Sequence, residues 1–165
     1  SSGLAPIIYG GAQERGLRAG TESVHNIAGM EEAFIQAYAN LDADKAYILD
    51  LKSYALASLK KAFPDAKFNG CCSDFDQSTY TIINVRLPIP EDKVALLGFS
   101  LDLQGIACSK GSACQSGSES GSHVLEHILS DEEQTMPSLR ISFSKFNTHK
   151  EIDRLVEVLS EYASS

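Results

Sequence analysis

The sequence predicts an α+β fold, and two kinds of periodicity carry this prediction. Residues 79–85 and 139–143 are rich in β-branched and apolar side chains, which is typical of strands. Apolar residues recur at helical spacing over 24–38, 48–63 and 152–159. Because these strands and helices do not follow strict βαβ alternation, we expect α+β rather than α/β architecture.

The first 21 residues are glycine-rich and have almost no helical pattern. Four glycines in residues 10–20 predict a shaped loop, because glycine takes positive φ without steric penalty. A helix should begin near Thr21 or Ser23, either of which could cap it. A second helix, which Asp42 could cap, should end at Pro64. Its apolar face would consist of Ile48, Leu51, Ala55, Leu59 and Phe63.

The middle of the chain should contain two strands with a helix between them. Residues 79–85 predict a buried strand, and Pro90 should open a short helix through Leu97, because proline is tolerated in the first turn. Residues 105–108 indicate a short second strand. Residues 109–122 are too rich in glycine and serine for the interior of an element, so we expect a mobile loop there.

The last third should add two helices and a strand. We expect a helix over 122–129, an acidic turn at 131–133 and an alternating strand over 139–143. Thr148 and Glu151 have the spacing of a capping box and should open the last helix. Its apolar face would consist of Ile152, Leu155, Val156 and Leu159.

Composition excludes several classes of protein. The chain has 165 residues and a net charge of −8, which fits one domain or one domain with an appendage. An acidic protein does not suit nucleic-acid phosphates, so we expect no nucleic-acid partner. Because we find no apolar run of membrane-spanning length, we expect no membrane partner. The N-terminus does not resemble a signal peptide, so we expect a cytoplasmic protein with reduced cysteines.

Cys114 is the most informative residue for chemistry. It lies in the glycine- and serine-rich segment, where a thiol would be exposed and movable, whereas structural cysteines usually face a core. Lys110 is a nearby cation that could lower the pKa of the thiol. A reactive thiol and a linker that happens to contain cysteine both remain open. Cys108 fits a small buried apolar group, and Cys71 and Cys72 fit structural or incidental roles.

Two further segments could bind anions. Arg140 should point away from its apolar neighbours on a strand, where its planar fork could bind a carboxylate from a substrate or from the protein. An exposed or salt-bridged arginine is an equal alternative. Arg15, Arg18 and Thr21 precede a helix and could form an anion site. This pattern lacks the lysine of a P-loop, so it is weak evidence by itself.

His123 and His127 are spaced i, i+4 and should share one helix face. Zinc ligands often have this spacing, but the segment lacks the His-Glu-x-x-His order and a third ligand, so we expect no metal. Either histidine could instead act as a base for Cys114, as in a Cys–His hydrolase.

Taken together, the motifs resemble a known family. Residues 10–21 and 26–30 resemble the middle of the cysteine desulfurases, which are pyridoxal-phosphate (PLP) enzymes of the class V aminotransferase group. Residues 109–114 resemble the cysteine loop of that family, and 122–125 and 139–144 resemble the segments that follow it. The resemblance implies the small C-terminal domain of a fold-type I PLP-dependent transferase, with a short mixed or antiparallel sheet packed by helices.

The resemblance also implies domains and residue roles. Residues 1–22 would be the tail of the large cofactor domain, and 23–165 the small domain with its mobile cysteine loop. Cys114 would attack the sulfur of L-cysteine held on PLP, release L-alanine and keep a persulfide for a sulfur-acceptor or scaffold protein in iron–sulfur cluster assembly. Arg140 would bind the substrate carboxylate. Thr21 would contact the cofactor phosphate across a dimer interface.

One family feature has no counterpart in these residues. The Schiff-base lysine lies upstream of the matching region, so the resemblance implies a C-terminal fragment that binds no PLP and is inactive alone. If the face of the small domain that docks on the large domain were left uncovered, its exposed apolar surface would favour a homo-oligomer. An alternative is a non-catalytic sulfur-carrier or interaction module, which would need Cys114 but not Arg140. The Cys–His hydrolase remains a further alternative.

Overall fold

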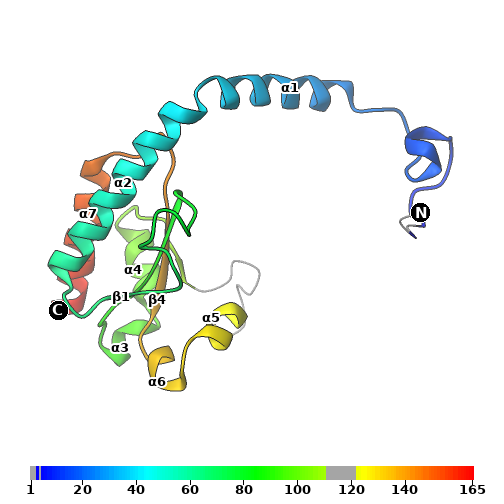
Figure 1. Cartoon of the computed structure of the whole chain (residues 1–165). Coiled ribbons are helices and arrows are strands. Elements are labelled where there is room, and N and C mark those ends of the chain that lie inside the picture. The colour runs from blue at the N-terminus through cyan, green and yellow to red at the C-terminus, as the bar shows by residue number, and fades with distance from the viewer. Residues whose placement is uncertain (1–2, 4, 111–121) are drawn as a thin grey trace. The chain divides into compact units, whose positions relative to one another are not determined.

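The computed structural model describes residues 3, 5–110 and 122–165 (Figure 1). These residues belong to two compact units, Ser1–Leu41 and Asp42–Ser165. The domain boundary that the resemblance implies between residues 22 and 23 stays a prediction. Cys114 and most of the expected mobile loop lie outside the described residues.

The first unit contains a 3-10 helix, Gln13–Gly16, and helix α1, Val24–Ala39. Ser23 occupies the N-cap position of α1, so the predicted helix start is confirmed. Gly20 has a φ of 103°, which side-chain-bearing residues rarely adopt. The glycine at this position therefore permits the turn that precedes α1.

Helix α1 has an apolar face without a cover. No residue of α1 is buried within the described part of the chain. Val24 and Tyr38 are 70% and 68% exposed, and Ile27 and Phe34 are also exposed. Exposed apolar surface of this kind usually marks an interface.

In the second unit, helices α2 (Leu41–Ala62) and α7 (His149–Ser164) lie side by side (Figure 1). The Tyr54 hydroxyl joins them by donating to Asp153 Oδ1 at 2.5 Å. Asp42 lies in the first turn of α2 rather than at its cap, because the helix already begins at Leu41. The capping box of Thr148 and Glu151 is confirmed at the start of α7.

Four antiparallel strands form one sheet in the order β1-β2-β4-β3, which settles the choice between a mixed and an antiparallel sheet. The strands are β1 (Lys67–Phe68), β2 (Ile82–Arg86), β3 (Ser109–Lys110) and β4 (Ser138–Ser142). The predicted strands over 79–85 and 139–143 correspond to β2 and β4, with shifted ends. Strand β1 was not predicted.

The expected strand over 105–108 is wrong. Helix α4 (Leu97–Leu103) precedes this segment, and Gly105 N and Ile106 N donate to Asp102 O and Leu101 O at its C-terminus. These bonds satisfy carbonyls that the helix end leaves free, so the segment completes a helix instead of a ladder. Pairing with β4 begins at Ser109.

Three short helices complete the unit: α3 (Glu91–Val94), α5 (His123–Ile128) and α6 (Asp131–Gln134). The helix expected from Pro90 through Leu97 is divided into α3 and the separate, unpredicted α4. The expected acidic turn at 131–133 is helical, because Ser130 and Glu133 form a capping box.

The core lies on one face of the sheet, where β2 and β4 pack against α2, α4 and α7. It includes Leu51, Ala55, Leu59, Ile83, Val85, Leu97, Leu101, Leu139, Ile141, Leu155 and Leu159. The opposite face of β2 and β4 carries polar side chains, among them Asn84, Arg86, Ser138 and Arg140. Among the described residues, no helix is long and apolar enough to span a membrane.

Lys52 is a buried charge that ties α2 to the segment before β2. Its side chain has no exposed surface, and Nζ donates to Ser78 Oγ at 2.8 Å and to Thr79 O at 2.7 Å. Burial lowers the pKa of Lys52 from its usual 10.5, against a smaller opposing effect of Cys72. Removal of the ammonium group from water disfavours its charged form more than the neighbouring groups favour it.

This lowered pKa predicts a pH dependence of stability. Between the folded-state pKa and the unfolded value of 10.5, the unfolded chain binds more protons, so wild type should gain stability as pH rises. Relative to Lys52→Met, the gain should be at most about 1.4 kcal/mol per pH unit for one proton. Urea unfolding of both proteins at several alkaline pH values measures it. Identical pH profiles would contradict the assignment to Lys52.

Candidate active site

The candidate site is centred on Arg140, on the polar face of the sheet. Leu139 and Ile141 are buried, and Arg140 points to the other face, as the alternation predicts. In the ladder, Arg140 lies opposite Asn84 of β2 and Ser109 of β3. Three strands therefore place polar side chains together.

The Arg140 guanidinium has no hydrogen-bond or ion-pair partner among the residues that the structure describes. By contrast, Arg86 on the same face is bound by Glu133 at 2.8 Å, and Arg154 on α7 by Glu157 at 2.7 Å. Of the carboxylates that the structure describes, none pairs with Arg140, so the salt-bridged alternative finds no partner among these residues. A permanently charged, half-buried fork with five donors is suited to a planar anion.

Strand β3 pairs with the strand that carries Arg140 and begins the cysteine segment, residues 109–122. Ser109 lies directly opposite Arg140, and Cys114 follows five residues later in the sequence. Five residues span at most about 18 Å even when fully extended, so the chain tethers Cys114 within that distance of Ser109. The thiol itself lies outside the described residues.

Thr21 lies in the first unit, between Gly20 and the N-terminus of α1, and is exposed. Its hydroxyl has no partner among the described residues. Arg18, one of the other candidates for an anion site here, is committed to Glu22 at 2.6 Å and to Gly20 O at 2.6 Å. Of these two residues, Thr21 therefore keeps its donor available.

His123 and His127 both lie on α5, where their spacing puts them on one helix face as predicted, and both are exposed. Because Cys114 lies outside the described residues, the Cys–His alternative stays a prediction. Over residues 5–110 and 122–165, no group of three or more metal-binding side chains occurs.

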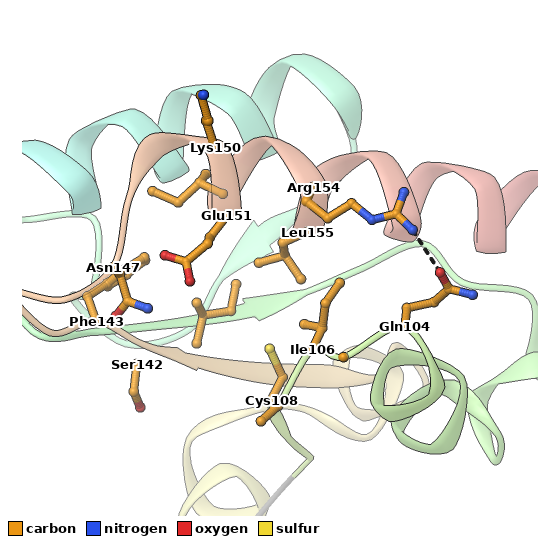
Figure 2. Close-up of a pocket in the computed structure, with 14 residues that line it drawn as sticks. Gln104, Ile106, Cys108, Ser142, Phe143, Asn147, Lys150, Glu151, Arg154 and Leu155 are labelled. Carbon is orange, nitrogen blue, oxygen red and sulfur yellow. Dashed lines mark hydrogen bonds between the residues drawn. The ribbon is translucent and has the colours of Figure 1, made fainter.

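The structure separates the described cysteines by environment. Cys71 is exposed, whereas the buried Cys72 donates its thiol hydrogen to Asn84 O at 3.2 Å. Cys108 is half-buried beside a cavity of about 400 Å³ between α7 and the end of β4. Figure 2 shows Cys108 and Ile106 across from Leu155 of α7. The sequence analysis missed this cavity, because its walls come from segments that only the tertiary fold brings together.

Burial raises the pKa of the Cys108 thiol to about 11. Since the thiolate is the nucleophile, only about one thousandth of this group is ionised at pH 8. Alkylation by iodoacetamide at pH 8 should modify Cys71 first, and the rate at Cys108 should rise about tenfold per pH unit up to pH 10. Peptide mass spectrometry measures both rates. Fast, pH-independent labelling of Cys108 would show that the thiol is not held protonated by burial.

Three described residues bear on whether this chain could contact PLP and its substrate. Lys52 is buried and committed to Ser78 and Thr79, so it cannot bind an aldehyde. Arg140 and Thr21 could each supply one contact, to a carboxylate and to a phosphate. Neither Arg140 nor Thr21 lines the cavity beside Cys108 or a second, more open one on α7.

Comparison with known proteins decides the family. Residues 8–155 match the family model described as aminotransferase class-V. The chain belongs to this family. The match covers most of the chain, including the segments on which the resemblance rests, so that prediction is confirmed. Enzymes of this family use PLP.

Several relatives of this class-V aminotransferase chain are named cysteine desulfurases. It is 36% identical over 150 residues to cysteine desulfurase IscS of Photobacterium profundum, covering 91% of this chain and 35% of the relative. It is also 36% identical to IscS of Methanosarcina thermophila, covering 96% and 38% of the two chains. The chain thus spans little more than a third of these relatives.

A solved NifS-like protein from Rickettsia africae has the same fold, with a TM-score of 0.74, 30% identity, and coverage of 98% of this chain and 40% of that protein. Another NifS-like protein matches with the same TM-score at 28% identity, covering 96% and 39%. These likenesses confirm the predicted α+β architecture of a PLP-dependent transferase.

Proposed function

We propose that this chain is the C-terminal part of a cysteine desulfurase, which converts L-cysteine to L-alanine and places the sulfur on Cys114. One observation carries the proposal. Arg140 has no internal partner among the described residues and lies opposite Ser109, at the start of the segment that carries Cys114. An anion site opposite the start of a segment that carries a thiol suits an amino acid that must donate sulfur.

Each residue has a separate task. Arg140 binds the carboxylate of L-cysteine and so fixes the orientation of its C–S bond. The Cys114 thiolate attacks the substrate sulfur, so that an S–S bond forms while the C–S bond breaks and Cys114 keeps a persulfide. PLP, when bound, supplies the electron sink for the departing electron pair. Thr21 donates a hydrogen bond to the cofactor phosphate across a dimer interface.

We also propose that the chain is inactive alone. Two observations support this proposal: the chain spans 35–38% of the length of its curated relatives, and the buried Lys52 is committed to Ser78 and Thr79. The missing contribution is a polypeptide that carries the cofactor-binding lysine. Persulfide from Cys114 would then pass to a sulfur-acceptor or scaffold protein.

Reconstitution tests this proposal. The chain mixed with PLP should show no absorbance band of protein-bound cofactor and release no sulfide from L-cysteine. Addition of a polypeptide with the remaining two thirds of a relative should restore both. A bound-cofactor band from the chain alone would contradict the proposed inactivity. A failure of every complementing polypeptide would contradict the desulfurase assignment.

The uncovered face of α1 supports a homo-oligomer. Val24, Met30 and Tyr38 are 70%, 59% and 68% exposed, and a second copy could bury them. Sedimentation of the chain should show a dimer or larger species. The Met30→Glu variant should sediment as a monomer, because an unpaired charge buried in the interface opposes association. A monomeric wild type would contradict this part of the proposal.

A further inference from the structure

Asn84 and Arg140 are close neighbours on the polar face of the sheet. They lie directly opposite each other in the antiparallel pairing of β2 and β4. Asn84 O accepts from Asn69 N at 2.9 Å, toward β1, whereas Phe143 N donates to Thr81 O and Leu87 N to Pro137 O at the two ends of the pairing of β2 with β4. Because these bonds alternate along the ladder, Asn84 and Arg140 form a non-hydrogen-bonded pair. In such a pair the side chains are closest.

Asn69 fixes which end of the Asn84 carboxamide is free. Asn69 is 5% exposed, and its Nδ2 donates to Asn84 Oδ1 at 2.8 Å and to Ser138 Oγ at 3.0 Å. With Asn84 Oδ1 occupied, the remaining polar group is the amino group, Nδ2. No described residue accepts a hydrogen bond from it. Two groups that can only donate, the Asn84 amino group and the Arg140 guanidinium, therefore belong to neighbouring side chains.

We propose that Asn84 and Arg140 together bind the substrate carboxylate, and that Asn69 is a positioning residue that keeps the Asn84 amino group available. The inference rests on the proposed function and adds a second donor to it. A carboxylate has two oxygens with about four acceptor sites, which a guanidinium and an amide can share. If the Asn84 carboxamide were reversed, its oxygen would face Arg140. It would then compete with the substrate for the guanidinium.

The first test needs no ligand. In Asn84→Asp, the introduced carboxyl group should lie beside Arg140 and accept from Asn69, and both effects favour the ionised form. Carbon-13 NMR titration of the full chain should give a pKa at least about one unit below the usual 3.9. In Asn84→Asp combined with Arg140→Gln, part of this decrease should disappear. An ordinary pKa in Asn84→Asp would overturn the proposed proximity.

The second test titrates the full chain with L-alanine, which has the amino acid carboxylate but no thiol. The side-chain amide signals of Asn84 and the Nε signal of Arg140 should shift with one common dissociation constant. L-alaninamide, which lacks the carboxylate, should shift neither. Asn84→Ala should weaken binding about three- to tenfold, which corresponds to the loss of one neutral hydrogen bond.

Matched variants distinguish a failure of this inference from a failure of the proposed function. Asn69→Leu, of similar size, should weaken binding as Asn84→Ala does, although Asn84 is still present. Ser142→Ala should leave it unchanged, because Ser142 is exposed on the same strand and pairs with Ile82 instead. Unchanged binding in Asn84→Ala with a normal Arg140 shift would overturn this inference and leave the proposed function intact. No Arg140 shift in wild type would contradict the carboxylate role itself.

Discussion

Replacement of Cys114 by alanine is expected to abolish persulfide formation in the reconstituted enzyme. The nucleophile that takes the sulfur would be missing, and neither Cys72 nor Cys108 is suited to replace it. Cys72 is buried and bonded to Asn84 O, and Cys108 is held protonated by burial with a pKa of about 11. The loss of a covalent nucleophile should lower the rate at least about a thousandfold. Mass spectrometry of the chain after incubation with L-cysteine measures the added sulfur.

Cys71→Ala is the matched control, because Cys71 is exposed and outside the cysteine segment. This variant should keep full persulfide formation. A persulfide found on Cys71 in the Cys114→Ala protein would relocate the acceptor. Unchanged sulfide release without any protein persulfide would contradict covalent catalysis by this chain. If His123→Ala and His127→Ala lost sulfide release but still formed the Cys114 persulfide, the histidines of α5 would instead act in another step.

The sequence analysis predicted correctly the elements that depend on residues close together in the chain. The capping box at Thr148 and Glu151 and the apolar face of α7 both follow from residues three or four positions apart. The strand at Arg140 also follows from alternation. The segment after α4 was misinterpreted because Gly105 serves the helix end rather than a ladder. Helix termination and strand initiation have similar sequence signals when the segment is short.

The site was predictable in part. Alternation gave the face on which Arg140 lies, since successive side chains of a strand point in opposite directions. It could not give the neighbours, because Asn84 is 56 positions away in sequence and its place opposite Arg140 depends on the pairing register. No local sequence pattern indicates a role for Asn69, because its side chain at the end of β1 donates to Ser138 of β4, 69 positions away in the sequence. Register is a property of the packed sheet.

The second large effect is expected at Arg140. Arg140→Gln should raise the KM for L-cysteine about thirty- to one-hundredfold in the reconstituted enzyme, because a charge-assisted contact to the carboxylate is lost. The persulfide yield at saturating L-cysteine should fall much less. Arg140→Lys should recover part of the affinity, since an ammonium keeps the charge but not the fork. Initial rates over a range of L-cysteine concentrations separate KM from kcat.

Arg154→Gln is the matched control for the loss of an arginine. Arg154 is exposed on α7, where it pairs with Glu157 and Gln104, so its replacement should leave KM unchanged. An Arg140→Gln protein with an unchanged KM would mean that the carboxylate is bound elsewhere. If that protein also accepted persulfide normally from an intact desulfurase, the chain would act as a sulfur carrier. A carrier needs the Cys114 thiol and has no use for an arginine that recognises a free amino acid.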